Sequence, residues 1–347
     1  MTTDSEPDKP LSEDEISQLT AQLENSTLSS DIDVGIHGNY PSDDEATRVA
    51  QTTMVFLKMF GTSLNLAGLE AVVIADDYAR ALAQLDRGFK TNESLSPTND
   101  EFGNGLAMAV SVIRNGTFRT HIVVHSGLSR SLADPKSEMY GLAVHLLAHE
   151  AAHAHDNLLK ARALPVLPPP PDYKKARLCV MAGHCWSEYI ACRLSARWGT
   201  NTFCKETEGM VCPMLSSARA RSNAAIDQFV GPGGIVKTAD EIIGIYGALL
   251  GRISYLLGHV HGLGANIEEM APDFLSLVVR TPWFKPLFEQ YELDLKALHE
   301  SYPDSWQGTD VFEPLMLTCE TLLNAGGMFF VRQMDGDYYI GLNRQSE

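Results

Sequence analysis

The sequence predicts an α+β protein whose strands are concentrated in the first half of the chain. Two β-rich runs within 106–124 flank the pair Asn115-Gly116, which is the strongest short signal for a β-hairpin. After the hairpin, apolar residues at 3.6-residue spacing over 142–159 predict a long helix without an internal proline or glycine. Residues 266–325 also have a mainly helical pattern, with turns at prolines. We therefore expect a small sheet region followed by a mainly helical C-terminal half.

Charge and hydropathy exclude some partners. The formal net charge of −17 over 347 residues argues against a nucleic-acid partner, which would need clustered Lys and Arg. Residues 1–33 hold nine acids against one lysine, so we expect an acidic disordered tail, in which Ser12 and Glu15 could cap one short helix. The chain has neither a signal-peptide pattern at its start nor a run of about 18 apolar residues. We expect a cytoplasmic protein without a membrane partner.

Short elements are predicted ahead of the hairpin. They are a helix starting at Asp43 or Asp44, a strand over 69–74, a helix over 78–85 and a loop over 91–105. Asp76 and Asp77 follow the strand and could form a metal-binding pair or a helix cap, of which we favour the cap.

The second run of the hairpin has an expected role in substrate binding. We interpret the segment from His121 to His125 as an exposed edge that leads directly into the long helix. Extended peptides are commonly held by adding a strand to such an edge, where backbone hydrogen bonds align them.

The long helix carries His149, Glu150 and His153 near its middle. Ser137 is a candidate N-cap, and the proline-rich stretch 165–171 cannot continue the helix. Residues four apart lie on one face of a helix, so both imidazoles can bind one metal ion while Glu150 points toward a bound water. A catalytic zinc site needs one more protein ligand.

Three arrangements can supply the third ligand. The pattern HExxHxxGxxH fails, because Asp156 occupies the glycine position and Leu159 the histidine position. A downstream Gly-Thr-x-Asp-x-x-Tyr pattern is not completed after Gly308. The remaining arrangement takes a glutamate from the next helix, where Glu188 is the only acidic residue in 173–205.

The surroundings of Glu188 are apolar, which predicts a largely buried carboxylate that needs a partner. A metal ion is one such partner. An ion pair with Arg193 or Arg197 is the alternative, and the histidine motif upstream favours the metal.

Together these features resemble the glutamate zincins, or gluzincins, a branch of the HExxH zinc metallopeptidases. The resemblance covers 106–198 and implies a zincin-like core made of an edge strand, the motif helix and the glutamate helix. It makes His149 and His153 zinc ligands, Glu150 the general base and Glu188 the third ligand. It also implies a hydrolase that uses Zn²⁺ and acts on a protein or peptide substrate.

One position departs from this family. The thermolysin branch has an aspartate four residues after the ligand glutamate, to orient a zinc histidine, and this chain has Cys192 there. We therefore expect that hydrogen bond to come from elsewhere, with Asp156 as the candidate. His155 could take part, and a solvent-exposed position explains it equally well.

Other polar residues are candidates for the cleft. His259 is the candidate catalytic donor to a developing oxyanion, with His261 and Tyr189 as alternatives, and helix capping explains His259 equally well. His145 and His184 each lie one helical turn before a predicted ligand, so both could line the cleft. His145 could instead replace Glu188 as a ligand, which we favour less because three ligands along one straight helix cannot converge on one ion. A core position explains His184 equally well.

The chain is expected to have three regions: the tail 1–33, a zincin-like catalytic core over 34–200, and a mainly helical region over 201–347 packed on that core. The further expected elements are helices over 174–198 with a stop at Gly199, over 218–229 and over 240–261, and a hairpin of 328–334 and 338–342 turned by Asp335-Gly336.

Two further interpretations concern function. Six cysteines without a C-x-x-C pair are expected to be free thiols, and a Cys204/Cys212 metal site is the lesser alternative. The competing functional reading is a non-catalytic regulatory or scaffold protein with structural zinc. The retained Glu150 favours an enzyme, because a structural site does not need a base.

Overall fold

The structure is a computed structural model that describes residues 21, 23–91, 94–97, 99–100, 103–164, 172–200, 202–229, 234–332 and 338–346. Several sequence predictions fall outside the described residues. They are the helix start at Ser12 and Glu15 with most of the acidic tail, the proline-rich stretch 165–171, and the turn at Asp335-Gly336.

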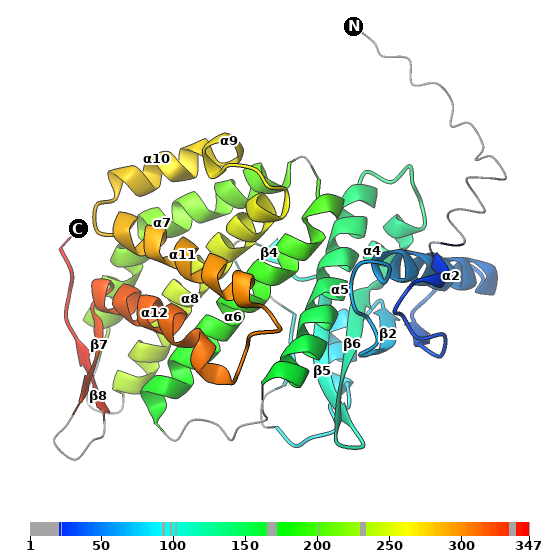
Figure 1. Ribbon diagram of the computed structural model, residues 1–347, viewed down its shortest axis with the longest axis horizontal. Coiled ribbons are helices and arrows are strands. Elements are labelled where there is room, and N and C mark those ends of the chain that lie inside the picture. Colours follow the sequence, from blue (N-terminus) through cyan, green and yellow to red (C-terminus); the bar gives the residue numbers. More distant parts are fainter. Residues whose placement is uncertain are drawn as a thin grey trace, which may run out of the picture.

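The fold is mixed α/β and 62% helical, with a small mixed sheet. Figure 1 shows the sheet and its covering helices on one side of the molecule and a helical body on the other. Helices α5 (Tyr140–Ala163) and α6 (Tyr173–Ser195) pack side by side between these two parts. The predicted mixture of a small sheet region and a mainly helical C-terminal half is therefore present.

Four strands form the sheet, in the order β1 (Asp33–His37), β2 (Leu69–Ala75), β6 (Thr117–His125) and β5 (Ala107–Arg114). β1, β2 and β6 run parallel, and β5 is antiparallel to β6. The predicted hairpin is confirmed. Its turn residues Asn115 and Gly116 have φ angles of 51° and 75°, the left-handed conformation that a two-residue hairpin turn requires.

The edge of the sheet next to the long helix is β5, so the predicted edge from His121 to His125 was wrong. β6 lies inside the sheet and pairs with both β2 and β5. Its residues from Thr120 to Val124 are all buried, as expected for a strand covered on both faces. The helix α4 (Ser126–Leu132) also separates β6 from α5, so the hairpin does not lead directly into the long helix.

The folded part of the chain begins before residue 34. Leu28 is buried in the same core as the helices that cover the sheet. The Thr27 hydroxyl donates to the backbone carbonyl of Leu64 at 2.6 Å. Asp33 opens β1, a five-residue strand that the polar tail composition had hidden.

Helices cover the two faces of the sheet unequally. α2 (Asp43–Phe60), α4 and α5 form a large core on one face with side chains such as Leu57, Val72 and Leu147. On the other face, the short helix α3 (Tyr78–Gln84) forms a smaller core with residues of β2, β5 and β6. The larger core lies on the side of the sheet from which α5 reaches α6.

Caps explain where the first helices start. The Asp77 carboxylate accepts the backbone N–H of Arg80 at 3.0 Å, so the interpretation of Asp77 as a helix cap is confirmed. α2 is capped by Ser42, which accepts the N–H of Glu45, rather than by Asp43 or Asp44. Serine supplies the same short acceptor as aspartate, which is why the two are hard to tell apart from sequence.

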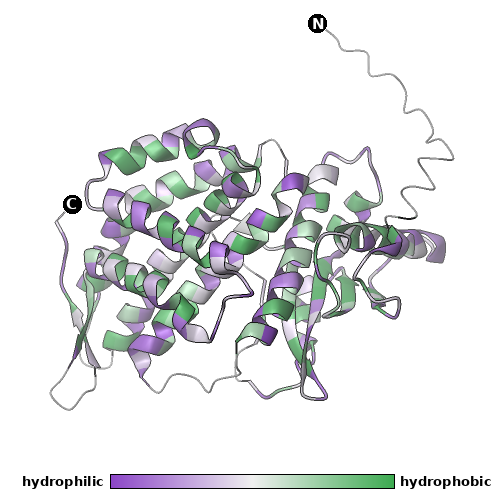
Figure 2. Ribbon diagram, viewed as in Figure 1, coloured by the Kyte–Doolittle hydropathy of each residue, from purple (hydrophilic) through white to green (hydrophobic). Residues whose placement is uncertain are grey.

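The helical body contains most of the remaining elements. They are the 3₁₀ turns Ala196–Trp198 and Thr309–Phe312, the helices α7 (Phe203–Asp227), α8 (Ile235–Gly262), α9 (Ile267–Met270), α10 (Pro272–Arg280), α11 (Lys285–Ser301) and α12 (Glu313–Ala325), and the hairpin β7 (Met328–Arg332) and β8 (Tyr338–Leu342). Earlier in the chain, the two-residue strands β3 (Asn99–Asp100) and β4 (Gly103–Asn104) pair with each other inside the loop predicted over 91–105. Figure 2 shows that these helices carry both hydrophobic and hydrophilic residues, as amphipathic helices do. α7 begins well before the predicted residue 218 and continues through Pro213.

Glycines let α8 pack closely against α6. A Cβ atom added at Gly258 would lie 2.3 Å from the Tyr189 carbonyl oxygen and 2.9 Å from the Cys192 Cβ. One added at Gly262 would lie 2.3 Å from the Arg193 carbonyl oxygen. The backbone of α8 therefore rests directly on α6.

α8 is also long and apolar enough to cross a membrane by length and composition, with a mean hydropathy of 1.2 over its best window. In this fold 61% of that window is buried inside the protein. A buried core helix passes the same test, so the property is weak evidence for a membrane.

Candidate metal centre

Helices α5 and α6 bring the three predicted ligands together. His149 and His153 lie one turn apart on α5, and Glu188 faces them from α6. The two Nε2 atoms are 3.0 Å apart, and each lies 3.4 Å from Glu188 Oε2. Ligand atoms of all three residues lie within 4.8 Å of one another. The arrangement follows from the four-residue spacing on one helix and the single acid on the next.

Burial and charge oppose each other in this cluster. Burial would raise the pKa of the Glu188 carboxyl, but the adjacent His153 and His149 lower that pKa well below its usual value. Burial would also lower the pKa of His153, and the Glu188 carboxylate raises it instead. These interactions favour an ionised Glu188 carboxylate paired with a protonated His153 when no cation is bound.

The donor set fits a zinc ion. Two imidazole nitrogens and one carboxylate oxygen are the protein ligands of a common type of catalytic zinc site, which keeps a fourth position open. Glu188 Oε2 is buried and has no hydrogen-bond partner among the described residues, so its lone pairs remain available to a cation.

The arginines that the sequence offered as alternative partners of Glu188 are engaged elsewhere. Arg193 donates to the Tyr189 hydroxyl at 3.0 Å. Arg197 donates to the Ser63 hydroxyl. Glu188 is therefore paired with histidines.

Glu150 lies beside the cluster at the edge of the sheet. Its Oε2 accepts the backbone N–H of Ala109 on β5 at 2.6 Å. Glu150 and the three cluster residues line one cavity of about 250 Å³, together with Ala107, Met108, Ala109, Ser111, Asn157, Ser187 and Tyr255. The general base predicted from the sequence and the predicted ligands therefore face the same space, which β5 borders.

Tyr255 on α8 is one of the polar residues of this cavity that the sequence interpretation missed. Its ring stacks on the His149 imidazole, with centroids 5.3 Å apart and an interplanar angle of 23°. Burial and the charge of Glu188 raise the pKa of Tyr255 well above its usual value, so the hydroxyl keeps its proton. Tyr255 lies one helical turn before His259, and that spacing was the available signal.

His259 and His145 lie outside the cavity, which corrects the predicted catalytic role of His259 and the predicted cleft position of His145. The two rings are 5.5 Å apart, and both contact Phe203. Each is no more than 2% exposed. Burial lowers the pKa of His259 to about 4, and burial with the charges of His149 and His259 lowers that of His145 to about 3. Both are neutral core side chains near neutral pH.

The alternative oxyanion donors also lie elsewhere. The Tyr189 hydroxyl is 2.9 Å from His261 Nδ1, and His261 Nε2 is 3.1 Å from Glu292 Oε1. This network joins α6, α8 and α11, and neither Tyr189 nor His261 lines the cavity. It fixes α6 in place one residue away from Glu188.

Asp156 does not support a ligand histidine by hydrogen bonding, which corrects that expectation. It is fully buried, accepts the Trp186 indole N–H at 3.2 Å and pairs with Lys160 at 2.7 Å. His155 Nδ1 accepts the backbone N–H of Asn65 at 2.7 Å, so it holds the loop before β2 instead of facing solvent freely. Both residues anchor α5 to its neighbours.

His184 does contact the cluster, from the solvent side. Its Nδ1 is 3.5 Å from Glu188 Oε1, and its side chain is 52% exposed. A weak, partly screened interaction with the carboxylate is what this geometry allows.

The second nitrogen of each cluster histidine faces α6. His153 Nδ1 is 3.1 Å from the Ser187 hydroxyl, and His149 Nδ1 is 3.6 Å from the Cys192 sulfur. Cys192 was noted in the sequence as a departure from an expected aspartate, and the structure places it at the position where that contact is made. All six cysteines, Cys192 included, are free, as predicted.

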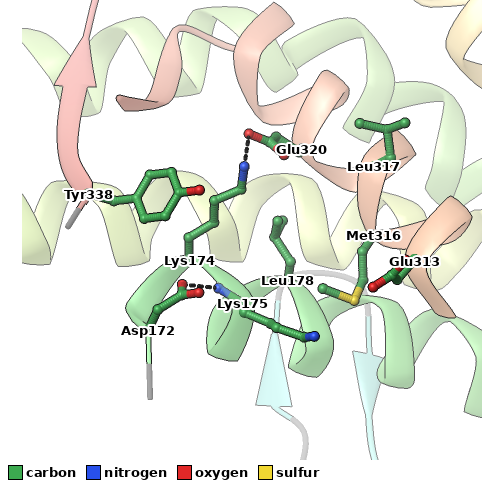
Figure 3. Close-up of a pocket in the computed structure, with 9 residues that line it drawn as sticks. All are labelled: Asp172, Lys174, Lys175, Leu178, Glu313, Met316, Leu317, Glu320 and Tyr338. Atoms are coloured by element: carbon green, nitrogen blue, oxygen red, sulfur yellow. Dashed lines mark hydrogen bonds and ion pairs between the residues drawn. The ribbon is translucent and has the colours of Figure 1, made fainter. Parts of the chain in front are cut away.

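Two other cavities lined by described residues contain no second cluster of potential metal ligands. A cavity of about 240 Å³ lies between the start of α6, α12 and β8, and Figure 3 shows two polar pairings in it. Lys174 bonds Glu320 at 2.7 Å, and Asp172 caps α6 by accepting the N–H of Lys175. A wider groove of about 660 Å³ lies beside β1, β2 and α3, where Asp76 and Asp77 are occupied as backbone acceptors.

Comparison of the chain with protein-family models, with curated proteins and with solved structures finds no match. The functional inference therefore rests on the geometry of the metal centre and on the chemistry of its residues.

Proposed function

We propose that this protein is a zinc-dependent peptidase with a zincin-like core. The observation that carries the proposal is one cavity in which His149, His153 and Glu188 converge and Glu150 stands beside them. A metal site with a purely structural role would not need a carboxylate in the same cavity that is not a ligand.

A zinc ion at this cluster would supply a Lewis acid that polarises a peptide carbonyl and lowers the pKa of a water molecule. Glu150 is placed to take a proton from that water and to pass it to the leaving amine. The Ala109 N–H fixes the orientation of its carboxylate. Tyr255, which keeps its proton, is placed to donate a hydrogen bond to the developing oxyanion.

The outer side of β5 provides a means of holding a peptide. Among the described strands β5 pairs with β6 alone, and its Ala109 N–H points away from β6 toward Glu150. An extended peptide that adds to this edge would run past Glu150 and the cluster. The substrate class supported by this geometry is an extended, unstructured segment of a protein or peptide.

A structural zinc site in a non-catalytic protein is the second candidate. The observation in its favour is the position of the cluster between α5 and α6, where a bound ion would join the sheet part to the helical body. In that case Glu150 would serve only as an acceptor for the Ala109 amide.

The exchange Glu150→Gln separates the two candidates. Glutamine keeps an oxygen for the Ala109 amide and removes the base, so we expect zinc content to be unchanged and cleavage of an unstructured protein to fall about 10²–10⁴-fold. The matched control is Glu138→Gln, an exposed acid ahead of α5. Equal cleavage by wild type and Glu150→Gln would refute the peptidase mechanism.

The exchange Glu188→Ala tests the ligand set. Outer hydrogen-bond partners of a metal ligand contribute roughly 10–100-fold to affinity, so loss of a ligand itself should weaken zinc binding by at least about 100-fold. Bound zinc can be measured by atomic emission and by competition with a coloured chelator. Full zinc occupancy in Glu188→Ala at low free zinc would exclude this residue as a ligand.

A further inference from the structure

The imidazoles of the metal centre are held from behind by uncharged side chains. Cys192 Sγ lies 3.6 Å from His149 Nδ1, and Ser187 Oγ lies 3.1 Å from His153 Nδ1. Both partners come from α6, the helix that also supplies Glu188. Among the described residues no carboxylate bonds either Nδ1 atom.

The geometry fixes which nitrogen carries the proton when a metal is bound. In each ring Nε2 faces the cluster, so Nε2 must offer its lone pair and Nδ1 must carry the hydrogen. That N–H needs an acceptor in a buried site. At His149 the acceptor is the Cys192 sulfur, and at His153 it is the Ser187 oxygen.

The chemical nature of these acceptors affects the metal. Histidines in metal sites commonly donate to a carboxylate or a carbonyl, which orients the ring and raises its basicity. A thiol is a weak acceptor and a serine hydroxyl is a neutral one. They orient the rings without the increase in basicity that a charged acceptor brings.

We propose that Cys192 is a positioning residue that holds His149 in its metal-binding orientation through an uncharged hydrogen bond, and that Ser187 does the same for His153. The inference rests on the proposed function in one respect, because it requires that the cluster binds zinc.

The surroundings of Cys192 are closely packed. A Cβ atom added at Gly258 of α8 would lie 2.9 Å from the Cys192 Cβ. Cys192 is fully buried where α6 contacts α5 and α8, and its sulfur lies beside the His149 imidazole.

The test is the zinc dissociation constant of the full chain, measured by chelator competition. Cys192→Ala should weaken zinc binding about 10-fold or more, since the Nδ1–H then loses its acceptor. Cys192→Ser restores a short acceptor and should bind within about threefold of wild type. Ser187→Ala should weaken binding in the same direction. The matched control is Cys185→Ala, which removes another fully buried α6 thiol and should leave zinc affinity unchanged.

A second readout separates positioning from ligation. Because Cys192 lies behind His149, the cobalt-substituted protein should show no sulfur-to-cobalt charge-transfer absorption. Such a band, lost in Cys192→Ala, would make Cys192 a ligand and overturn the positioning role.

Two further outcomes are decisive. Wild-type zinc affinity in Cys192→Ala would overturn the inference, and absence of zinc binding by wild type would overturn it together with the proposed function. Zinc binding that depends on Cys192 supports the inference even if Glu150→Gln cleaves as well as wild type. That result would overturn the proposed role of Glu150 as the general base and leave the inference about Cys192 standing.

Discussion

Two pairs of histidines with opposite properties meet along α5: His149 with His153 one turn later, and His145, one turn before His149, with His259 of α8. His149 and His153 face Glu188, whose carboxylate raises the pKa of His153 despite burial. His145 and His259 pack against Phe203, and burial lowers their pKa values to about 3 and about 4. The Glu188 carboxylate therefore favours the protonated form of His153, whereas His145 and His259 are neutral near neutral pH.

The difference shows that a buried histidine on the ligand face of a helix is not sufficient for a site. His145 and His149 share α5 and nearly the same direction from the helix axis. What separates them is the residue opposite on the neighbouring element: an acid on α6 for one, and an aromatic ring on α7 for the other. The residues that pack opposite each turn of α5 therefore determine which of its histidines can belong to a metal site.

The largest expected difference between the two regions concerns the donors on α8. Tyr255 lines the cavity, and Tyr255→Phe removes its hydroxyl. If this hydroxyl is the oxyanion donor that we propose, its loss should lower kcat about 10²–10³-fold. His259→Phe, one turn later, should leave kcat within a few-fold of wild type. Zinc content and kcat are measured for both variants. A larger loss of kcat in His259→Phe than in Tyr255→Phe would contradict the assignment of Tyr255, and not His259, to the cavity.

The second largest expected effect is a loss of folding stability at acid pH, which arises from the two neutral histidines, His145 and His259. The unfolded chain protonates these histidines near pH 6.5, whereas folded His259 does so near pH 4. Stability from keeping His259 neutral is thus complete above pH 6.5 and is lost as the pH falls toward 4. At about 1.4 kcal/mol per pKa unit, this loss is on the order of 3 kcal/mol.

Urea unfolding at pH 7 and pH 4, with a chelator present, measures this loss. His259→Leu cannot take up the proton, so its stability should fall less between the two pH values than that of wild type. His184→Leu, on the exposed side of Glu188, is the control. Parallel losses in wild type and His259→Leu would show that His259 is protonated in the folded protein as easily as in the unfolded chain.

The smallest expected effect concerns His184 and tests whether this residue belongs to the cluster. His184→Ala removes a half-exposed ring that lies 3.5 Å from Glu188 Oε1. Exposed ionic contacts contribute about 0–1 kcal/mol, so zinc affinity should change by less than about fivefold. A loss comparable with that of Glu188→Ala would place His184 among the ligands.

The cluster of His149, His153 and Glu188 could be predicted because its information is local. The four-residue spacing of His149 and His153 requires only that 142–159 be helical, and the apolar pattern specifies that. Glu188 could be found because it is the single acid in an apolar helix, and buried carboxylates need partners. Neither inference needed the arrangement of the remaining chain.

The missed features depend on contacts between distant segments. The hairpin pattern defines β5 and β6 as partners, but only the parallel pairing of β2 with β6 leaves β5 at the edge. The choice of Tyr255 over His259 depends on how far α8 is rotated and shifted against α6. Likewise, Cys192 and Ser187 acquire a role only when α6 lies against α5.

The close contact between α8 and α6 gives the glycines of α8 an influence on the geometry of the candidate metal centre, although they have no functional group of their own. Gly258 lies less than one turn after Tyr255, and its Cα faces the Tyr189 carbonyl and the Cys192 Cβ. A methyl group at this position would push apart the helices that carry the phenol, the thiol and the carboxylate. The distance between the α8 and α6 backbones thus sets how these three groups are placed relative to one another. That distance is short because Gly258 has no side chain.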